Sequence, residues 1–207
     1  LTVVPAGVDT SVFRPSPAPR VPGRIVATAS ADVPLKGLAP LLEAVAKLRT
    51  ERDVELGVVG RPKVGGTALQ AIERLGLEEA VRFVAGVTEE ARVELFGSAE
   101  VGVVPSLYEG FSLPAVELMA CATPLVATTA GALPEVVGPD GETALHVPPN
   151  DPEALAAAVG RLLDDPVLAA RIGAAGRERV IERFTWRAVA EQTVAWYRQN
   201  LEESPTC

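Results

Sequence analysis

Short runs of aliphatic and β-branched residues, each followed by a single helical pattern, most strongly limit how this chain can fold. The apolar runs lie at residues 24–28, 54–59, 81–84, 101–104, 124–128 and 143–147. Alanine- and leucine-rich helical patterns separate the first five of them, at residues 37–50, 68–75, 89–98 and 113–121. Strands that are apolar on both faces and separated by single helices are typical of a parallel sheet covered on both sides. We therefore predict an α/β fold with a doubly wound, Rossmann-like parallel sheet of about six strands.

The two ends of the chain differ from this alternating middle. Five prolines in the first 22 residues remove backbone donors and favour extended or turn geometry. From Asp151 onward the pattern is helical, with helices that begin after Asp151, at Pro166 and near Thr185. The predicted organisation is an interdomain linker at 1–22, an α/β domain at 23–184 and a C-terminal helix at 185–207.

Composition and charge exclude several classes of function. The chain has 207 residues, 48% of them hydrophobic and 22% charged, which is typical of a globular domain with one core. Nineteen Lys and Arg against 27 Asp and Glu give a net charge of −8, which disfavours binding to nucleic acid or anionic lipid. No apolar run approaches the ~20 residues of a membrane span. We expect a cytoplasmic protein without a membrane span, and association of the full-length protein with a membrane stays open.

Residue types that often carry chemistry are predicted to be structural in this chain. Two cysteines, one of them Cys121 in an apolar stretch, form neither a disulfide framework nor a metal-ligand cluster. The single histidine, His146, lies in an apolar run without partners at ligand spacing. Trp186 and Trp196 lie on an amphipathic pattern that favours packing over sugar binding. The glycines at 60–66 match neither a dinucleotide nor a P-loop motif, so we predict no cofactor and no metal.

The segment between the run at 101–104 and the helix at 113–121 is the richest candidate site. Ligands of open parallel sheets bind at the carboxyl ends of the strands, near the point where the strand order reverses. In this segment Gly110 permits close approach of a ligand, Ser112 can cap the helix, and Pro114 suits its first turn. The free N–H groups and the dipole of such a helix start favour a phosphate.

Two glutamates, Glu109 and Glu117, belong to the same segment. Ionised carboxylates accept hydrogen bonds from adjacent hydroxyls, so Glu109 could contact a sugar and Glu117 the hydroxyls of a ribose. An ordinary strand-to-helix turn with two solvated glutamates is the alternative that spacing alone leaves open. A retaining glycosidase is disfavoured, because eight residues at ~1.5 Å each give ~12 Å, well beyond the ~5.5 Å between its two carboxyl groups.

Four blocks of the sequence, in order, resemble the group 1 retaining glycosyltransferases of GT-B fold. The family's interdomain linker is similar to VVPAGVDTSVFRP and its phosphate-binding lysine motif to LKG. Its donor-site block is similar to PSLYEGFSLPAVELMACATPLVATTAGALPEVV, and its following strand and helix to DGETALHVPPNDPEALAAAV. Glu109 and Glu117 have the family's hallmark spacing of seven intervening residues. The resemblance implies that the predicted domain is one half of a GT-B fold.

The resemblance also implies roles for individual residues. Lys36 would neutralise the diphosphate and stabilise the leaving group, and Glu109 would contact the transferred sugar, so these two residues are the predicted catalytic residues. The other contacts with the donor would come from backbone groups of Gly110, Phe111 and Ser112 at the sugar and diphosphate, from Leu113 at the nucleoside, and from Glu117 at the ribose.

The sequence departs from the family pattern at three positions. The family usually has an arginine five residues before the lysine, where this chain has Ala31. We hypothesise that Arg61 or Lys63, in the loop after the second apolar run, supplies the missing charge. Ala122 and Ala144 stand where glycines are common in the family.

The predicted function is the donor-binding half of a retaining glycosyltransferase. It would transfer a sugar from a nucleoside diphosphate sugar to an unknown acceptor, held by a missing N-terminal domain towards which the C-terminal helix would pack. Two alternatives stay open: a non-catalytic module that binds nucleotide sugars, and a sugar-nucleotide epimerase of GT-B fold.

Overall fold

In the computed structural model, which describes residues 3–29 and 33–203, six parallel strands form one sheet. Their order across the sheet is β3-β2-β1-β4-β5-β6, which confirms the predicted doubly wound α/β fold. The strand order reverses between β1 and β4, so the loops that follow these two strands lie side by side at the carboxyl edge. The strands are β1 (Val21–Thr28), β2 (Glu55–Val59), β3 (Val81–Val84), β4 (Ala99–Val104), β5 (Leu125–Thr128) and β6 (Leu145–Val147).

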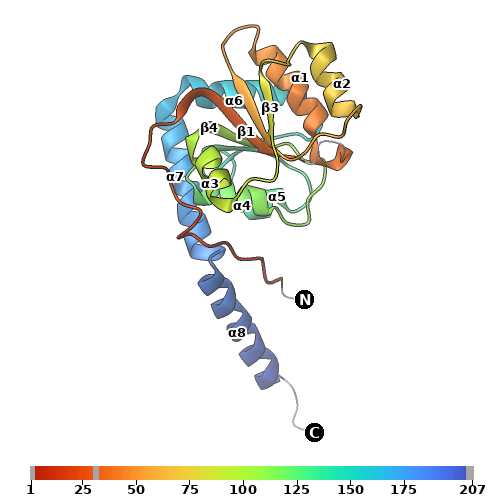
Figure 1. Cartoon of the computed structure of the whole chain (residues 1–207). Coiled ribbons are helices and arrows are strands. Elements are labelled where there is room, and N and C mark those ends of the chain that lie inside the picture. The colour runs from red at the N-terminus through yellow and green to blue at the C-terminus, as the bar shows by residue number, and fades with distance from the viewer. Residues whose placement is uncertain (1–2, 30–32, 204–207) are drawn as a thin grey trace.

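Helices connect these strands and continue to the end of the described chain (Figure 1). Those that precede β6 are η1 (Pro34–Lys36), α1 (Leu38–Leu48), α2 (Thr67–Leu75), α3 (Glu89–Ser98), α4 (Leu113–Ala120) and α5 (Leu133–Val137). Those that follow β6 are α6 (Pro152–Asp164), α7 (Pro166–Arg183) and α8 (Trp186–Glu203).

The two faces of the sheet are covered by different helices (Figure 1). Neighbouring residues of β1 show this: Ile25 belongs to a buried apolar cluster with Leu41 of α1, and Val26 to a second cluster with Leu118 of α4. Helices α2 and α6 add to the first cluster, and α3 and α5 add to the second. Burial of one such side chain contributes about 1.5–3 kcal/mol. The strands are therefore apolar on both faces because helices cover both.

Helix α5 was not predicted from the sequence. It has five residues, with a proline at its start and Leu133, Val136 and Val137 buried. A helix this short completes little more than one turn, so its apolar residues show no readable helical period. The other strand and helix boundaries lie within a few residues of the predicted ones.

The segment before β1 lies against the α/β body. The Val8 amide donates to the carbonyl of Phe184, at 2.7 Å. Phe13 is buried in the second apolar cluster, and its carbonyl accepts a hydrogen bond from Arg177 of α7 at 3.3 Å. This segment, predicted as a linker, is thus packed against the domain over part of its length.

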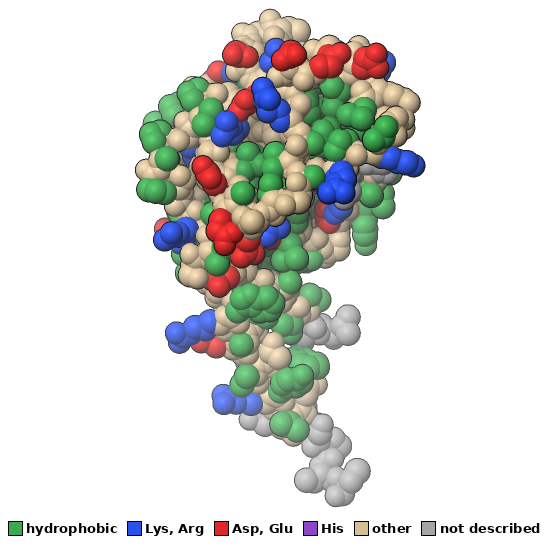
Figure 2. Space-filling model, viewed as in Figure 1, with side chains coloured by type: hydrophobic (Ala, Val, Ile, Leu, Met, Phe, Trp, Pro, Cys, Tyr) green, Lys and Arg blue, Asp and Glu red, His purple; other side chains and the backbone are tan. Residues whose placement is uncertain are grey.

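Helix α8 projects away from the body (Figure 1). Figure 2 shows hydrophobic side chains along the projection, and the exposed large ones are Trp186, Val194, Tyr197 and Leu201. Trp186 was expected to pack, but 61% of it is exposed, although its ring lies close to Gly7. Among the described helices, none is both long and apolar enough to cross a membrane.

A backbone hydrogen bond and a close backbone approach join the loop after β1 to the loop after β4. The Leu107 amide donates to the Leu35 carbonyl at 2.8 Å. Gly37, which has a left-handed φ of 65°, lies so near the Pro105 carbonyl that a Cβ at this position would overlap the oxygen. This close approach fixes where Lys36 stands relative to the loop that contains Glu109.

We predict that Gly37→Ala destabilises the protein more than Gly76→Ala. Both glycines have φ near 65°, but nothing lies within 4 Å of a Cβ at Gly76. The left-handed conformation alone costs an alanine about 1–2 kcal/mol, and overlap with the Pro105 carbonyl adds to that cost at Gly37 only. Urea unfolding followed by circular dichroism measures both. Equal losses for the two variants would show that the loops are not held by this contact.

Candidate functional site

An ion pair lies where the strand order reverses. Lys36 is the last residue of η1 after β1, and Glu109 lies in the loop after β4. The Lys36 Nζ is 2.8 Å from Glu109 Oε1. Glu109 is 8% exposed, whereas about a third of the Lys36 side chain, 35%, is accessible. The structure therefore brings together the two residues that were predicted to be catalytic, although they are 73 positions apart.

The loop after β5 and a serine hold Glu109 in place. The Ser106 hydroxyl donates to Glu109 Oε1 at 2.7 Å, and the Thr128 hydroxyl donates to the Ser106 carbonyl at 2.5 Å. The backbone of Glu109 is fixed as well, because its carbonyl accepts from the Ala132 amide at 2.8 Å. Gly131 lies so near that carbonyl that a Cβ would overlap it. These supporting residues were missed in the sequence, since no spacing marks them.

The start of α4 has the geometry of an anion site. Ser112 caps the helix by accepting from the Ala115 amide at 3.4 Å, as predicted. Gly110 borders open space, and Leu113 is 45% exposed. The ring of Phe111 packs edge-on against Phe184, with 5.8 Å between ring centroids, so its backbone is held near the helix start. This helix start follows closely on Glu109, the partner of Lys36, and a helix N-terminus favours an anion such as a phosphate.

Glu117 has surroundings quite different from those of Glu109. It lies on α4, is 9% exposed, and its Oε1 is 3.3 Å from the Arg92 guanidinium of α3. Burial raises the pKa of the Glu117 carboxyl above its ordinary value, Arg92 opposes that rise, and Glu89 adds to it. The two glutamates of the motif are thus each paired with a different cation.

A cavity of about 350 Å³ lies beside Arg92. It is lined by the ends of β2 and β3, the loops after them and the start of α3: Val59, Gly60, Arg61, Val84, Ala85, Gly86, Val87, Glu89 and Arg92. Arg61, hypothesised to replace the family's arginine, is therefore placed at this cavity. Ala31, where that arginine would stand, lies outside the described residues. Arg92 and Glu89 were missed because a single charge pair on a helix carries no motif.

The remaining chemically active residue types have structural surroundings. His146 is half-buried in β6, and its backbone amide donates to Asp140 at 2.8 Å. Cys121 is buried, and desolvation raises the pKa of its thiol to about 12. In the part of the chain that the structure describes, no three His, Cys, Asp or Glu side chains converge as metal ligands.

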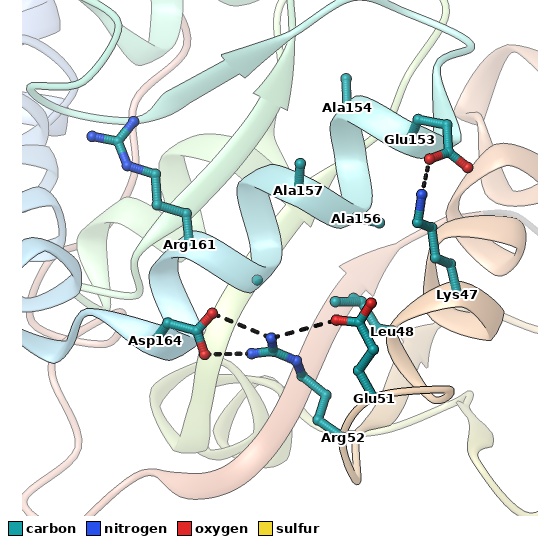
Figure 3. A pocket seen from close by; sticks show the side chains of 11 residues that line it. Lys47, Leu48, Glu51, Arg52, Glu153, Ala154, Ala156, Ala157, Arg161 and Asp164 are labelled. Carbon is teal, nitrogen blue, oxygen red and sulfur yellow. Dashed lines mark hydrogen bonds and ion pairs between the residues drawn. The ribbon is translucent and has the colours of Figure 1, made fainter.

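A larger hollow, of about 680 Å³, lies between α1 and α6 (Figure 3). Two ion pairs span it: Lys47 with Glu153, and Arg52 with Asp164 at 2.6 Å. Alanines of α6 line much of the rest. Lys47 lies near the far end of α1, a helix about 16 Å long that begins beside Lys36. The hollow offers a lysine–glutamate pair that is separate from the candidate site.

Comparison with known proteins places the chain among glycosyltransferases. The profile described as "Glycosyl transferases group 1" matches residues 22–165. The MMP alpha-(1->4)-mannosyltransferase of Mycolicibacterium hassiacum is 53% identical over 100% of this chain and 50% of its own length. This chain thus spans about half the length of the curated relatives it matches.

Solved structures agree with that assignment. Sucrose-phosphate synthase from Thermosynechococcus elongatus superposes with a TM-score of 0.82 and 34% identity, over 97% of this chain and 53% of that chain. The C-terminal domain of a group 1 family glycosyl transferase, LpcC from Francisella tularensis, gives a TM-score of 0.77 and 25% identity, over 87% of this chain and 100% of that chain.

We predict that Glu117→Gln changes how stability depends on pH. Because the folded-state pKa of Glu117 is raised, its contribution to stability is present below the unfolded pKa and is lost as pH rises through the folded value. The unfolding free energy of the variant, relative to the natural protein, should therefore rise between pH 4 and pH 8. Urea unfolding at several pH values measures this difference.

Glu90→Gln is a control of opposite sign. Hydrogen bonds, first from its own backbone amide and then from Thr88, lower the pKa of Glu90. Its contribution is therefore present above the unfolded pKa and is lost as pH falls through the lower folded value. The relative stability of this variant should fall as pH rises through this acidic window and stay constant at higher pH. A flat difference for Glu117→Gln would contradict the assigned burial effect.

Proposed function

Because the chain belongs to the group 1 glycosyltransferases, we propose that it is the donor-binding half of a retaining glycosyltransferase. It binds a nucleoside diphosphate sugar, and the sugar is transferred to an acceptor held by another part of the protein. The observation that carries this proposal is the Lys36–Glu109 pair beside the start of α4. The chain's span of about half the length of its relatives supports the assignment to one half of the enzyme.

In this proposal, Lys36 and the N-terminus of α4 bind the diphosphate. As the glycosidic bond breaks, negative charge grows on the leaving phosphate, and a fixed cation and aligned N–H groups stabilise it. Backbone groups of Gly110, Phe111 and Ser112 line the path of the diphosphate and sugar. Lys36 supplies charge that a divalent metal supplies in other transferases, so we propose that the reaction is metal-independent. The departing phosphate itself accepts the proton of the acceptor.

Glu109 contacts the transferred sugar in this proposal. Its hydrogen bonds within the described residues go to Oε1, from Ser106 and Lys36, so Oε2 can accept from a sugar hydroxyl. The relative that is 53% identical is named as a mannosyltransferase, so nucleoside diphosphate mannose is the first donor to test.

The nucleoside lies further along the site. Glu117 accepts from the two ribose hydroxyls, and Leu113 packs beside the nucleoside. The neighbouring cavity of about 350 Å³ adjoins Arg92, the ion-pair partner of Glu117.

Helix α8 is the proposed contact with the acceptor-binding half. An exposed apolar surface on a projecting helix is a typical protein–protein contact. Trp186, Tyr197 and Leu201 of α8 are more than half exposed, and Figure 2 shows hydrophobic side chains along the projection. We propose a cytoplasmic location because the chain has few cysteines and no disulfide framework.

We predict that Lys36→Met weakens binding of nucleoside diphosphates by about tenfold or more, the loss expected for one hydrogen bond to a charged group. Calorimetric titration with UDP, GDP and ADP, and with their mannose and glucose conjugates, measures the affinities. Lys47→Met is the matched control, since Lys47 also forms an ion pair with a glutamate but lies at the hollow in Figure 3.

The outcomes separate the possible functions. Equal affinities for Lys36→Met, Lys47→Met and the natural chain would contradict the diphosphate site. Binding without sugar transfer by the full-length protein would favour a non-catalytic module. Interconversion of the donor without an acceptor would favour an epimerase.

We predict that the double variant Arg61→Ala/Lys63→Ala weakens binding of the diphosphate more than that of the nucleoside alone. The reason is that one of these cations is proposed to share the charge of the diphosphate, as the arginine missing at Ala31 would. Arg74→Ala is the control, because Arg74 is an exposed arginine on α2 whose ion pair with Glu43 is long, at 3.9 Å. Unchanged diphosphate affinity in the double variant would remove both residues from the site.

A further inference from the structure

Arg92 of α3 lies between the nucleotide site and the segment that precedes β1. Its guanidinium is 3.3 Å from the Glu117 carboxylate and 3.5 Å from Glu89. On another side, it lies over the ring of Phe13, 5.1 Å from the centroid. Arg92 also lines the cavity of about 350 Å³. One side chain therefore contacts a predicted donor-binding residue and the polypeptide outside the α/β core.

Phe13 is itself firmly held. It is 3% exposed, its amide donates to the Asp9 carbonyl at 2.9 Å, and its own carbonyl accepts from Arg177. A ring fixed in this way offers a rigid face for a cation, and such a contact is worth more when it is shielded from water. Arg92 has a long, flexible stem, so the Phe13 ring restricts the positions its guanidinium can take.

Glu117 needs Arg92 for two physical reasons. First, the Glu117 carboxylate can accept hydrogen bonds from both ribose hydroxyls only if it is ionised and turned towards them. Secondly, burial works against ionisation, and Arg92 is the cation that opposes this effect. Glu89, which lies on α3 like Arg92, raises the pKa of Glu117 and so acts against Arg92. On α4 itself, the nearby titratable group is the buried thiol of Cys121 at the helix end.

We propose that Arg92 is a positioning residue for Glu117, and that Phe13 holds Arg92, so the segment before β1 sets the nucleotide affinity of the site. This inference rests on the proposed function, because it requires that Glu117 binds ribose. It also has a consequence for the proposed enzyme, whose other half would be joined to this segment. A shift of the segment would change the affinity for the nucleotide although the segment does not contact the nucleotide.

The test compares each nucleoside diphosphate with its 2′-deoxy analogue, using whichever of UDP, GDP and ADP the natural chain binds best. The natural chain should prefer the ribose form. Arg92→Met should weaken binding of the ribose form by about tenfold and that of the deoxy form much less, so the preference collapses. Arg92→Lys keeps the positive charge and should retain most of the preference for the ribose form. An unchanged preference in Arg92→Met would overturn the inference.

A double-mutant cycle distinguishes positioning from direct contact. If Arg92 acts through Glu117, then Arg92→Met should cause little further loss in a Glu117→Gln background. Additive losses would mean that Arg92 binds the nucleotide directly, which overturns the positioning role. Lowering the pH should also weaken nucleotide binding, and this loss should begin at a higher pH in Arg92→Met than in the natural chain. The reason is that Glu117 takes up a proton more readily when Arg92 is removed. An unshifted pH profile would count equally against the proposal.

Phe13→Leu tests the contact between the Phe13 ring and Arg92. It keeps an apolar side chain but removes the ring, and should weaken binding of the ribose form by about threefold, with no further effect in an Arg92→Met background. Phe83→Leu, which removes a half-buried ring packed against the other face of the sheet, is the control. Circular dichroism establishes that each variant is folded.

The failure of this inference differs from that of the proposed function. If the natural chain binds no nucleoside diphosphate, the donor site itself is wrong. If it binds one with a preference for ribose, yet Phe13→Leu and Phe83→Leu behave alike, only the role of Phe13 is overturned.

Discussion

The reversal of strand order between β1 and β4 is the constraint on which the site depends. In a parallel sheet all carboxyl ends lie at one edge, and at the reversal the helices after the two strands pack on opposite faces, which leaves room for a ligand between the loops. The Leu107–Leu35 hydrogen bond and the close approach of Gly37 to Pro105 then hold the two loops together. Lys36 and Glu109 meet because the sheet brings their loops together, and no local sequence signal was needed to pair them.

Positive side chains at the carboxyl edge of the sheet are paired locally with glutamates, although the net charge of the chain is negative. The chain carries −8 overall, and long-range attraction of an anionic ligand is therefore unfavourable. Each buried glutamate of the motif is instead paired with one cation, Lys36 for Glu109 and Arg92 for Glu117. A carboxylate that has lost water needs such a partner to stay ionised. The cations thus pair with the glutamates and, in the proposed complex, lie next to the anionic and hydroxyl groups of the donor.

The sequence predicted the sheet and the loop residues because both have a regular pattern. Six apolar runs with helical segments between them determine a doubly wound sheet, and the glutamate spacing resembles a family motif. Ser106, Arg92 and Phe13 had no such signal, since their roles arise from tertiary contacts between residues far apart in sequence. The expectation that Trp186 packs stays a prediction, because its ring lies close to Gly7 while 61% of the residue is exposed, and an amphipathic pattern does not show what covers an apolar face.

Two segments outside the strands and helices of the sheet, one before β1 and one between α7 and α8, contact residues of the candidate site. Phe13, in the segment before β1, touches Arg92, and Phe184, just before α8, touches Phe111 of the candidate loop. The Val8 amide also donates to the Phe184 carbonyl, so these two segments are joined to each other. A displacement of the first segment would therefore reach Glu117 through Phe13 and Arg92, and a displacement of Phe184 would reach the loop after β4 through Phe111. This coupling between the two segments and the candidate site would act through the contacts of Phe13, Phe111 and Phe184 and through the Val8–Phe184 hydrogen bond. It would require no change in the sheet itself.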